Sequence, residues 1–119
     1  MTNIYCEIYG NTIKNKVLSY LMENQYLGIS VGDMAKELKI SRPKAYEIVD
    51  EYIKKGYIIK SRIVGRTQLY IINKENSIAK IYLRNFRECI KMVIDEYSAK
   101  NNKSNSSTNN IGIASAKTH

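Results

Sequence analysis

Residues 40–56 read ISRPKAYEIVDEYIKKG, and the other predicted elements are arranged around this segment. Ser41 is a residue type that caps helix N-termini, and Pro43 is tolerated in a first turn, where amide hydrogens have no partner within the helix. Gly56 suits the left-handed conformation in which many helices end. Together these signals predict one helix over residues 42–55.

Apolar residues recur along this predicted helix at spacings of three and four, which places them on one face. They are Ala45, Ile48, Val49, Tyr52 and Ile53. Charged and polar residues occupy the other positions, and the first turn carries two cations, Arg42 and Lys44. The helix is therefore expected to bury one stripe and to leave a cationic N-terminal turn exposed.

The segments on either side predict a second helix and a hairpin. Upstream, Ser30 and Asp33 have the spacing of a capping pair and open a short helix. Gly32 within it either is simply tolerated in a first turn or lets backbone amides approach another surface. Downstream, residues 57–63 and 68–72 are rich in Ile and Tyr. Two such stretches joined by a turn that contains glycine predict a β-hairpin.

The beginning of the chain is less informative. Residues 1–10 have no reliable period and stay unassigned. Thr12 then caps a predicted helix that extends to about residue 24. Its apolar stripe consists of Ile13, Val17, Leu18, Leu21 and Met22. After this helix, Leu27 and Ile29 are expected to add a short strand beside the hairpin.

Helix, tight turn, helix and a hairpin with a basic tip follow one another in the order of a winged helix-turn-helix. Residues 40–56 resemble the recognition-helix segment of ArsR- and MarR-like regulators, with a polar N-cap, a small apolar residue four places on and a glycine that opens the wing. The chain looks most like the small winged-helix proteins of archaea and of their plasmids and viruses. The resemblance covers residues 11–73. It implies an α+β, mostly helical fold with three helices, a β-hairpin wing and a DNA-binding function.

The charge balance also favours a polyanionic partner. Nineteen Lys and Arg against eleven Asp and Glu give a net charge of +8 and a sequence pI near 9.5. Residues 36–66 hold nine cations and four anions, a local balance of 9 − 4 = +5. Nucleic acid is the first class of partner that such a charge suggests, and a membrane surface is the second. A lysine-rich composition that reflects only the genome or solubility is the alternative.

The resemblance assigns DNA contacts to particular residues. The first turn of the predicted helix at 42–55 would enter the major groove, where Arg42, Lys44 and Tyr46 would contact base edges. Ser30 and Ser41 would hold phosphates through hydroxyls and helix-terminal amides. The wing would reach the flanking backbone or minor groove. Its candidate residues are Lys60, Arg62, Arg66, Thr67 and Gln68. Alternatively, the wing arginines serve only solubility and edge protection.

Residues 77–98 predict a long helix that starts at an N-cap, Ser77. Its apolar stripe is broader than the domain ahead of it can cover. We therefore expect a homodimer, most simply an antiparallel pair of these helices across a two-fold axis. The predicted interface consists of Tyr82, Phe86, Cys89, Ile90, Val93, Ile94 and Tyr97. The alternative is a last helix that folds back over its own domain.

These elements divide the chain into three parts. Residues 1–75 are predicted to form the winged-helix domain and 76–98 the dimerisation helix. Residues 99–119 are rich in Asn, Ser and Lys and are predicted to be a disordered tail. No signal peptide and no apolar run near 18 residues is found, so a cytoplasmic protein without membrane insertion is expected.

Sequence motifs for catalysis and metal binding are missing. The chain has no H-E-x-x-H, no G-x-S-x-G and no phosphate-binding P-loop motif. Cys6 and Cys89 stand far apart and His119 is the only histidine, so no zinc site and no disulfide framework is indicated. We therefore expect neither an enzyme nor a cofactor or metal.

Two kinds of function remain open at this point. The first is a dimeric protein that binds double-stranded DNA sequence-specifically and regulates transcription, as a repressor in the simplest case. The second keeps the fold but coats DNA with little sequence preference, as architectural or plasmid-partition proteins do, or binds another protein.

Overall fold

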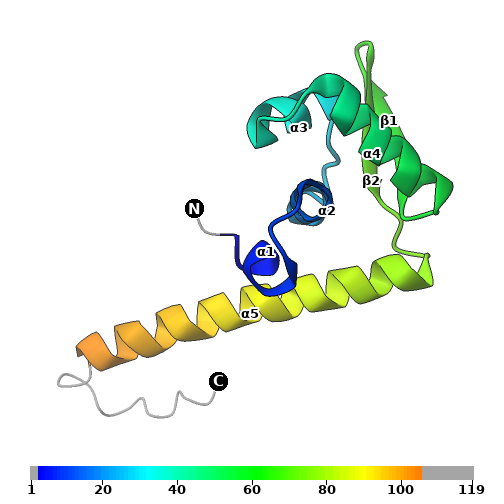
Figure 1. The fold of residues 1–119 in the computed structure, drawn as a ribbon. Coiled ribbons are helices and arrows are strands. Elements are labelled where there is room, and N and C mark those ends of the chain that lie inside the picture. Colours follow the sequence, from blue (N-terminus) through cyan, green and yellow to red (C-terminus); the bar gives the residue numbers. More distant parts are fainter. Residues whose placement is uncertain (1–2, 106–119) are drawn as a thin grey trace.

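The computed structural model describes residues 3–105, with side chains as far as Lys100. Figure 1 shows its helices and one two-stranded sheet. The elements are α1 Ile4–Tyr9, α2 Ile13–Glu23, α3 Val31–Leu38, α4 Arg42–Lys54, β1 Ile58–Val64, β2 Thr67–Ile72 and α5 Ser77–Asn105. The order of α2 to α5 confirms the predicted fold class, because three helices and a β-hairpin wing precede one long helix.

Capping side chains start α2, α3 and α4 at the residues that the sequence predicts. Thr12, Ser30 and Ser41 each accept a hydrogen bond from the amide three residues further on, at 3.1, 3.1 and 3.2 Å. Left-handed backbone follows two of these helices, at Lys39 (φ 58°) after α3 and at Gly56 (φ 83°) after α4. Local chemistry therefore sets the limits of the helix-turn-helix.

The wing is the antiparallel pair β1–β2, whose two turn residues are Gly65 and Arg66. Gly65 has a φ of 63°, which is the sign that a type II′ turn requires at its first central residue. A β-bulge lies between Lys60 and Ile63, so that two residues of β1 face one of β2. The bulge interrupts the regular alternation of side chains along β1.

The segment before α3 adds to the open side of β2. Ile29 and Tyr70 exchange two backbone hydrogen bonds of 2.9 Å, so the short strand predicted beside the hairpin is present only as a single bridged pair of residues. Leu27 was expected to join it, but its side chain is exposed and makes no such bridge. Because only β2 is bridged, β1 forms the outer edge of the wing.

The core lies between α2, α3, α4, the start of the hairpin and the first half of α5. Its fully buried members include Leu18, Leu21, Met22, Met34, Ile48, Val49, Ile58, Ile72 and Leu83. Two predicted stripe residues lie at its edge, since Ile53 is half-buried and Ile13 is exposed. The remaining stripe residues of α2 and α4 are buried as predicted.

The N-terminal segment, which the sequence leaves unassigned, forms the short helix α1. Asn3 caps it by accepting a hydrogen bond from the amide of Cys6 (3.2 Å), and the amide group of Asn3 donates to Ser19 Oγ on α2 (3.1 Å). The buried Tyr5 ring lies 6.4 Å from the ring of Phe86 on α5. Figure 1 shows α1 between α2 and α5, so it completes the packing of α5.

The helix α5 differs from its prediction at both ends. Asn76, rather than Ser77, is the cap, because Asn76 Oδ1 accepts from the amides of Ile78 and Ala79, both at 2.9 Å. Residues 99–105, predicted to be disordered, continue the helix, and no glycine or proline is present there to end it. The rest of that predicted tail, 106–119, lies outside the described residues. Twenty-nine residues of helix span about 43 Å, and Figure 1 shows α5 projecting beyond the winged unit.

No helix within residues 3–105 combines the length and the apolar character that a membrane span needs. Over the same residues, His, Cys, Asp and Glu side chains form no group of three that could hold a metal ion. Cys6 and Cys89 are buried free thiols, and burial raises the pKa of both.

Candidate nucleic-acid interface

A polar cleft of about 400 Å³ lies between the first turn of α3, the first turn of α4 and the wing. Residues from all three elements line it, although they are separate in the sequence. Six of the ten residues predicted to contact DNA are among them: Ser30, Arg42, Tyr46, Arg66, Thr67 and Gln68. The tertiary structure therefore brings the recognition-helix and wing predictions together on one surface.

The other four predicted residues lie outside this cleft. Ser41 caps α4, and the side chain of Lys44 lies 3.7 Å from Glu47 in an exposed ion pair. Lys60 and Arg62 are exposed on β1, the outer strand of the wing. Ser41 and Lys44 thus flank the cleft on α4, whereas the two β1 cations stand apart from it.

Within the cleft, the guanidinium of Arg42 lies against the backbone of Gly32. A Cβ atom added to Gly32 would stand 2.8 Å from an Nη atom of Arg42 and 3.4 Å from its Cζ. Asp33 also lines the cleft, so one carboxylate accompanies the two arginines. Arg42 nevertheless forms no ion pair with any described residue.

The position of α4 is fixed by contacts that no local pattern indicates. The Tyr52 hydroxyl donates to the carbonyl of Lys14 on α2 (3.3 Å), and Lys14 Nζ lies 3.0 Å from Glu51. Lys55 reaches the same carboxylate at 3.1 Å. The hydrogen bond from Lys14 is the main cause that lowers the pKa of Glu51, and the hydrogen bond from Lys55 is the second. Lys14 is 37 residues from Glu51 and 38 from Tyr52 in the sequence, so only the fold reveals that these two contacts orient α4.

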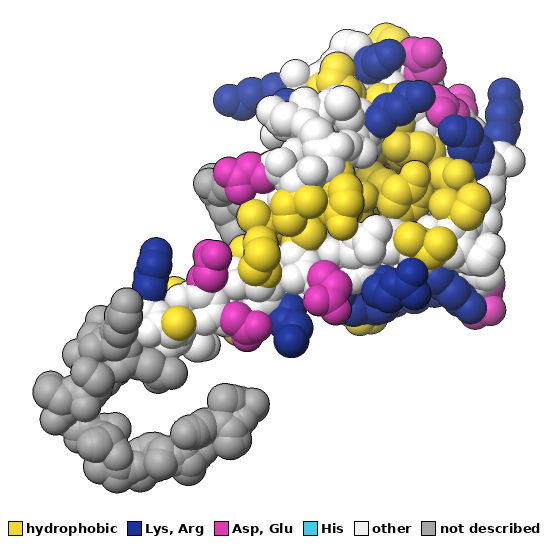
Figure 2. Space-filling model, turned by 60° about the horizontal axis from the view of Figure 1, so that its bottom comes forward, with side chains coloured by type: hydrophobic (Ala, Val, Ile, Leu, Met, Phe, Trp, Pro, Cys, Tyr) yellow, Lys and Arg dark blue, Asp and Glu magenta, His cyan; other side chains and the backbone are white. Residues whose placement is uncertain are grey.

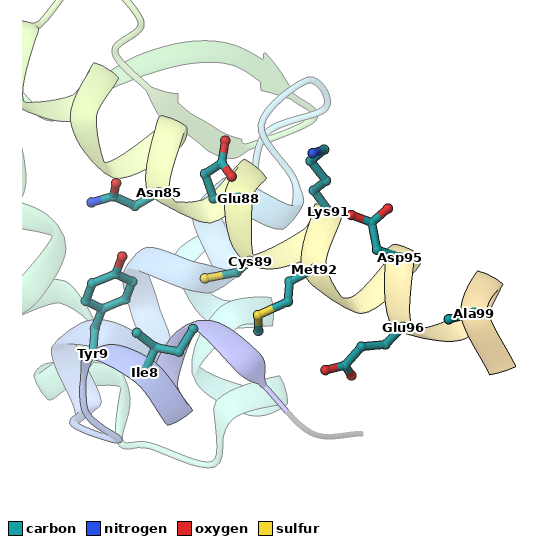
Figure 3. A pocket seen from close by; sticks show the side chains of 10 residues that line it. All are labelled: Ile8, Tyr9, Asn85, Glu88, Cys89, Lys91, Met92, Asp95, Glu96 and Ala99. Atoms are coloured by element: carbon teal, nitrogen blue, oxygen red, sulfur yellow. The ribbon is translucent and has the colours of Figure 1, made fainter. Parts of the chain in front are cut away.

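A second hollow, of about 510 Å³, lies between α1 and α5. Figure 3 shows Ile8 and Tyr9 of α1 on one side of it, with Cys89 and Met92 of α5 opposite. Charged side chains of α5 form its outer rim, among them Glu88, Lys91, Asp95 and Glu96. The sequence does not indicate this hollow, because residues 1–10 have no apolar period that predicts α1.

The predicted dimer interface divides into two groups. Phe86 and Cys89 are buried in this chain's own core, and the Tyr82 ring packs on Tyr57 with centroids 5.8 Å apart. Phe86 and Cys89 therefore need no partner for their burial, contrary to the expectation, whereas Tyr82 is only half-buried. The remaining four are exposed: Ile90 at 39%, Val93 at 42%, Ile94 at 56% and Tyr97 at 66%.

Comparison with known proteins finds no matching family model and no matching curated protein. Solved structures do match. The chain superposes on MepR, a transcription regulator of the Staphylococcus aureus multidrug efflux pump MepA, with a TM-score of 0.52 at 18% identity, covering 85% of this chain and 78% of MepR. A MepR F27L mutant bound to an oligodeoxyribonucleotide gives 0.53 at 15% identity over 87% and 78%.

The adhesin competence repressor AdcR from Streptococcus pyogenes gives a TM-score of 0.55 at 16% identity, covering 84% of this chain and 74% of AdcR. The chain has a MarR-like winged helix-turn-helix fold. MepR is described as a transcription regulator and AdcR as a repressor. At such identities the similarity concerns the fold alone. MepR and AdcR come from bacteria, so they lend no support to the predicted resemblance to archaeal, plasmid or viral proteins.

Proposed function

We propose that this chain binds double-stranded DNA as a homodimer and regulates transcription, most simply as a repressor that occupies a promoter. The observation that carries the proposal is the polar cleft, which unites Arg42 and Tyr46 of α4 with Arg66 of the wing. A protein of the same fold, the MepR F27L mutant, has a structure bound to an oligodeoxyribonucleotide, which supports DNA binding as the use of this fold.

DNA binding would use α4 and the wing in different ways. The N-terminal turn of α4 enters the major groove. Lys44 and Tyr46 are exposed and do not belong to the core, so their side chains are available to contact base edges there. The cations of the wing, Lys60, Arg62 and Arg66, meet the flanking backbone or minor groove. Hydroxyl and amide groups around these cations come from Ser30, Ser41, Thr67 and Gln68. The net charge of +8 adds attraction that does not depend on sequence.

The dimer would form through the second half of α5. On the face seen in Figure 2, hydrophobic side chains gather over the body of the molecule, and few are seen along the projecting part of α5. The apolar stripe of α5 continues past the point where the winged unit ends, through Ile90, Val93, Ile94 and Tyr97. A second copy related by a two-fold axis would cover these residues and present two α4 helices to DNA. The operator would then be a palindrome with half-sites about one helical turn apart.

Fluorescence anisotropy would test this function, with a duplex from upstream of the protein's own gene and a scrambled duplex of equal length. Each duplex is titrated at several salt concentrations, and binding to both should weaken as salt rises because phosphate contacts release counterions. A specific regulator should bind the upstream duplex about a thousandfold more tightly. Failure to bind either duplex at low salt would exclude DNA binding.

A DNA-coating protein is the second candidate, and the local balance of +5 over residues 36–66 favours it. Coating depends on phosphate charge and not on base edges. Equal affinities for the upstream and scrambled duplexes would point to it. A selection from random-sequence DNA would then decide, because a regulator whose operator lies elsewhere enriches one motif and a coating protein enriches none.

A further inference from the structure

The side chain of Arg42 takes an unexpected direction. It belongs to the first residue of α4, and side chains on a helix lean toward its N-terminus. This direction leads to the first turn of α3, where the guanidinium lies on Gly32. The side chain therefore lies against the neighbouring helix and does not extend straight from α4 as a base-reading residue would.

This placement depends on the missing side chain of Gly32. A Cβ there would come within 2.8 Å of the Arg42 Nη atom, which is closer than Cβ atoms approach other heavy atoms, so the flexible end of the Arg42 side chain would have to move. Gly32 is in the second position of α3 and is absent from the set of glycines with positive φ. Its backbone would therefore accept another residue, and the lack of a side chain matters because it leaves room for the guanidinium.

The surroundings of Arg42 suit an anionic group. Arg66 of the wing lines the same cleft, and Ser30 lies at its edge beside the first turn of α3. That turn leaves the amides of Val31 and Gly32 without intrahelical partners. Asp33 contributes one carboxylate, so the two arginines leave an excess of one positive charge. A DNA phosphodiester carries one negative charge and projects from the duplex toward such a recess.

We propose that Gly32 is a positioning residue for DNA binding, which seats Arg42 so that it contacts a backbone phosphate together with Arg66. Base edges are then left to Lys44 and Tyr46, which lie further along α4. This assignment rests on the proposed function and replaces the sequence-based expectation that Arg42 reads a base. It also decides between the two interpretations of Gly32 in favour of a functional one.

The deciding variant is Gly32→Ala. Alanine favours a helix over glycine, and the clashing atom is the end of a flexible side chain, so the thermal midpoint should stay equal or rise. Affinity for DNA should fall severalfold at the same time, because the methyl group displaces the guanidinium. A residue with a merely structural role would not lose DNA affinity while the protein became more stable.

The probes are a random-sequence duplex and the duplex bound most tightly by the wild type, each titrated by fluorescence anisotropy over a series of salt concentrations. Arg42→Ala should weaken binding to both by the same factor, about tenfold, and should reduce the salt slope by about one phosphate. Gly32→Ala should have no further effect in the Arg42→Ala background. Arg84→Ala, which removes the same charge from an exposed position on α5, is the matched control and should change neither quantity by a comparable amount.

Three results would overturn the assignment while leaving DNA binding intact. The first is a Gly32→Ala protein that binds as the wild type does, and the second is an effect of Gly32→Ala that persists without Arg42. The third is an Arg42→Ala protein that loses affinity only for the preferred duplex, since this would make Arg42 a base reader. A wild-type protein that binds neither duplex at low salt would instead overturn the proposed function, and this assignment with it.

Discussion

The two halves of α5 share one apolar pattern and differ in what covers it. In the first half, Ala79, Leu83 and Phe86 are buried against the winged unit and α1. In the second half, Val93 and Ile94 continue the same stripe but are exposed. Periodicity therefore predicts which face of a helix becomes buried, whereas the neighbouring elements decide where along the helix burial is achieved.

Removing a large side chain from the buried half of α5 should have the largest effect on stability. Phe86→Ala removes a ring that is 7% exposed and contacts Tyr5, so the free energy of unfolding should fall by about 3–5 kcal/mol. Urea unfolding followed by circular dichroism measures it. Tyr97→Ala on the exposed half is the paired control and should cost about 0.5 kcal/mol or less at protein concentrations where protomers are separate. Similar losses at both sites would contradict the division of α5.

Charges on the exposed half should act on association and leave the fold intact. The double variant Val93→Glu and Ile94→Glu should weaken dimerisation on the order of a hundredfold or more, because two side chains lose apolar burial against the partner. Sedimentation equilibrium measures this, and circular dichroism should remain that of the wild type.

The control for that variant is Arg84→Ala with Arg87→Ala, which changes the net charge by the same two units at exposed positions of α5. This control should remain dimeric. A Val93→Glu and Ile94→Glu protein that still sediments as a dimer would place the interface elsewhere, and the hollow between α1 and α5 would be the next surface to test.

The smallest effect concerns Tyr5, which packs beneath the buried half. Burial is the main cause that raises the pKa of Tyr5 to about 12, and the neighbouring Tyr82 adds to the effect. The unfolded chain would release this proton near pH 10, so the stability linked to Tyr5 is complete below pH 10 and is lost as pH rises toward 12. Unfolding measured across this range should show a shallower decline for Tyr5→Phe than for the wild type. An unchanged decline would contradict the burial of this hydroxyl. Some decline should remain in the variant, since burial also raises the pKa of Tyr52.

The helix and strand limits of the winged unit can be predicted from the sequence more completely than those of α1. Ser30, Ser41 and Gly65 act within a few residues of their own positions, through caps and a turn, so their chemistry can be read along the chain. By contrast, α1 has six residues and no complete apolar period, and Asn3 and Tyr5 are ordered by contacts to α2 and α5. A helix that short gains its stability from tertiary packing.

The helix limits of the winged unit, the hairpin, the excess of positive charge and the residue types available for DNA all follow from the sequence. Which of these side chains share a surface follows from tertiary packing. It placed Arg42 on Gly32 beside Arg66 and left Lys60 and Arg62 outside the cleft. It also divided the stripe of α5 into a covered and an uncovered half. The physical reason is that caps and turns act over three or four residues, whereas packing and cleft geometry join residues tens of positions apart.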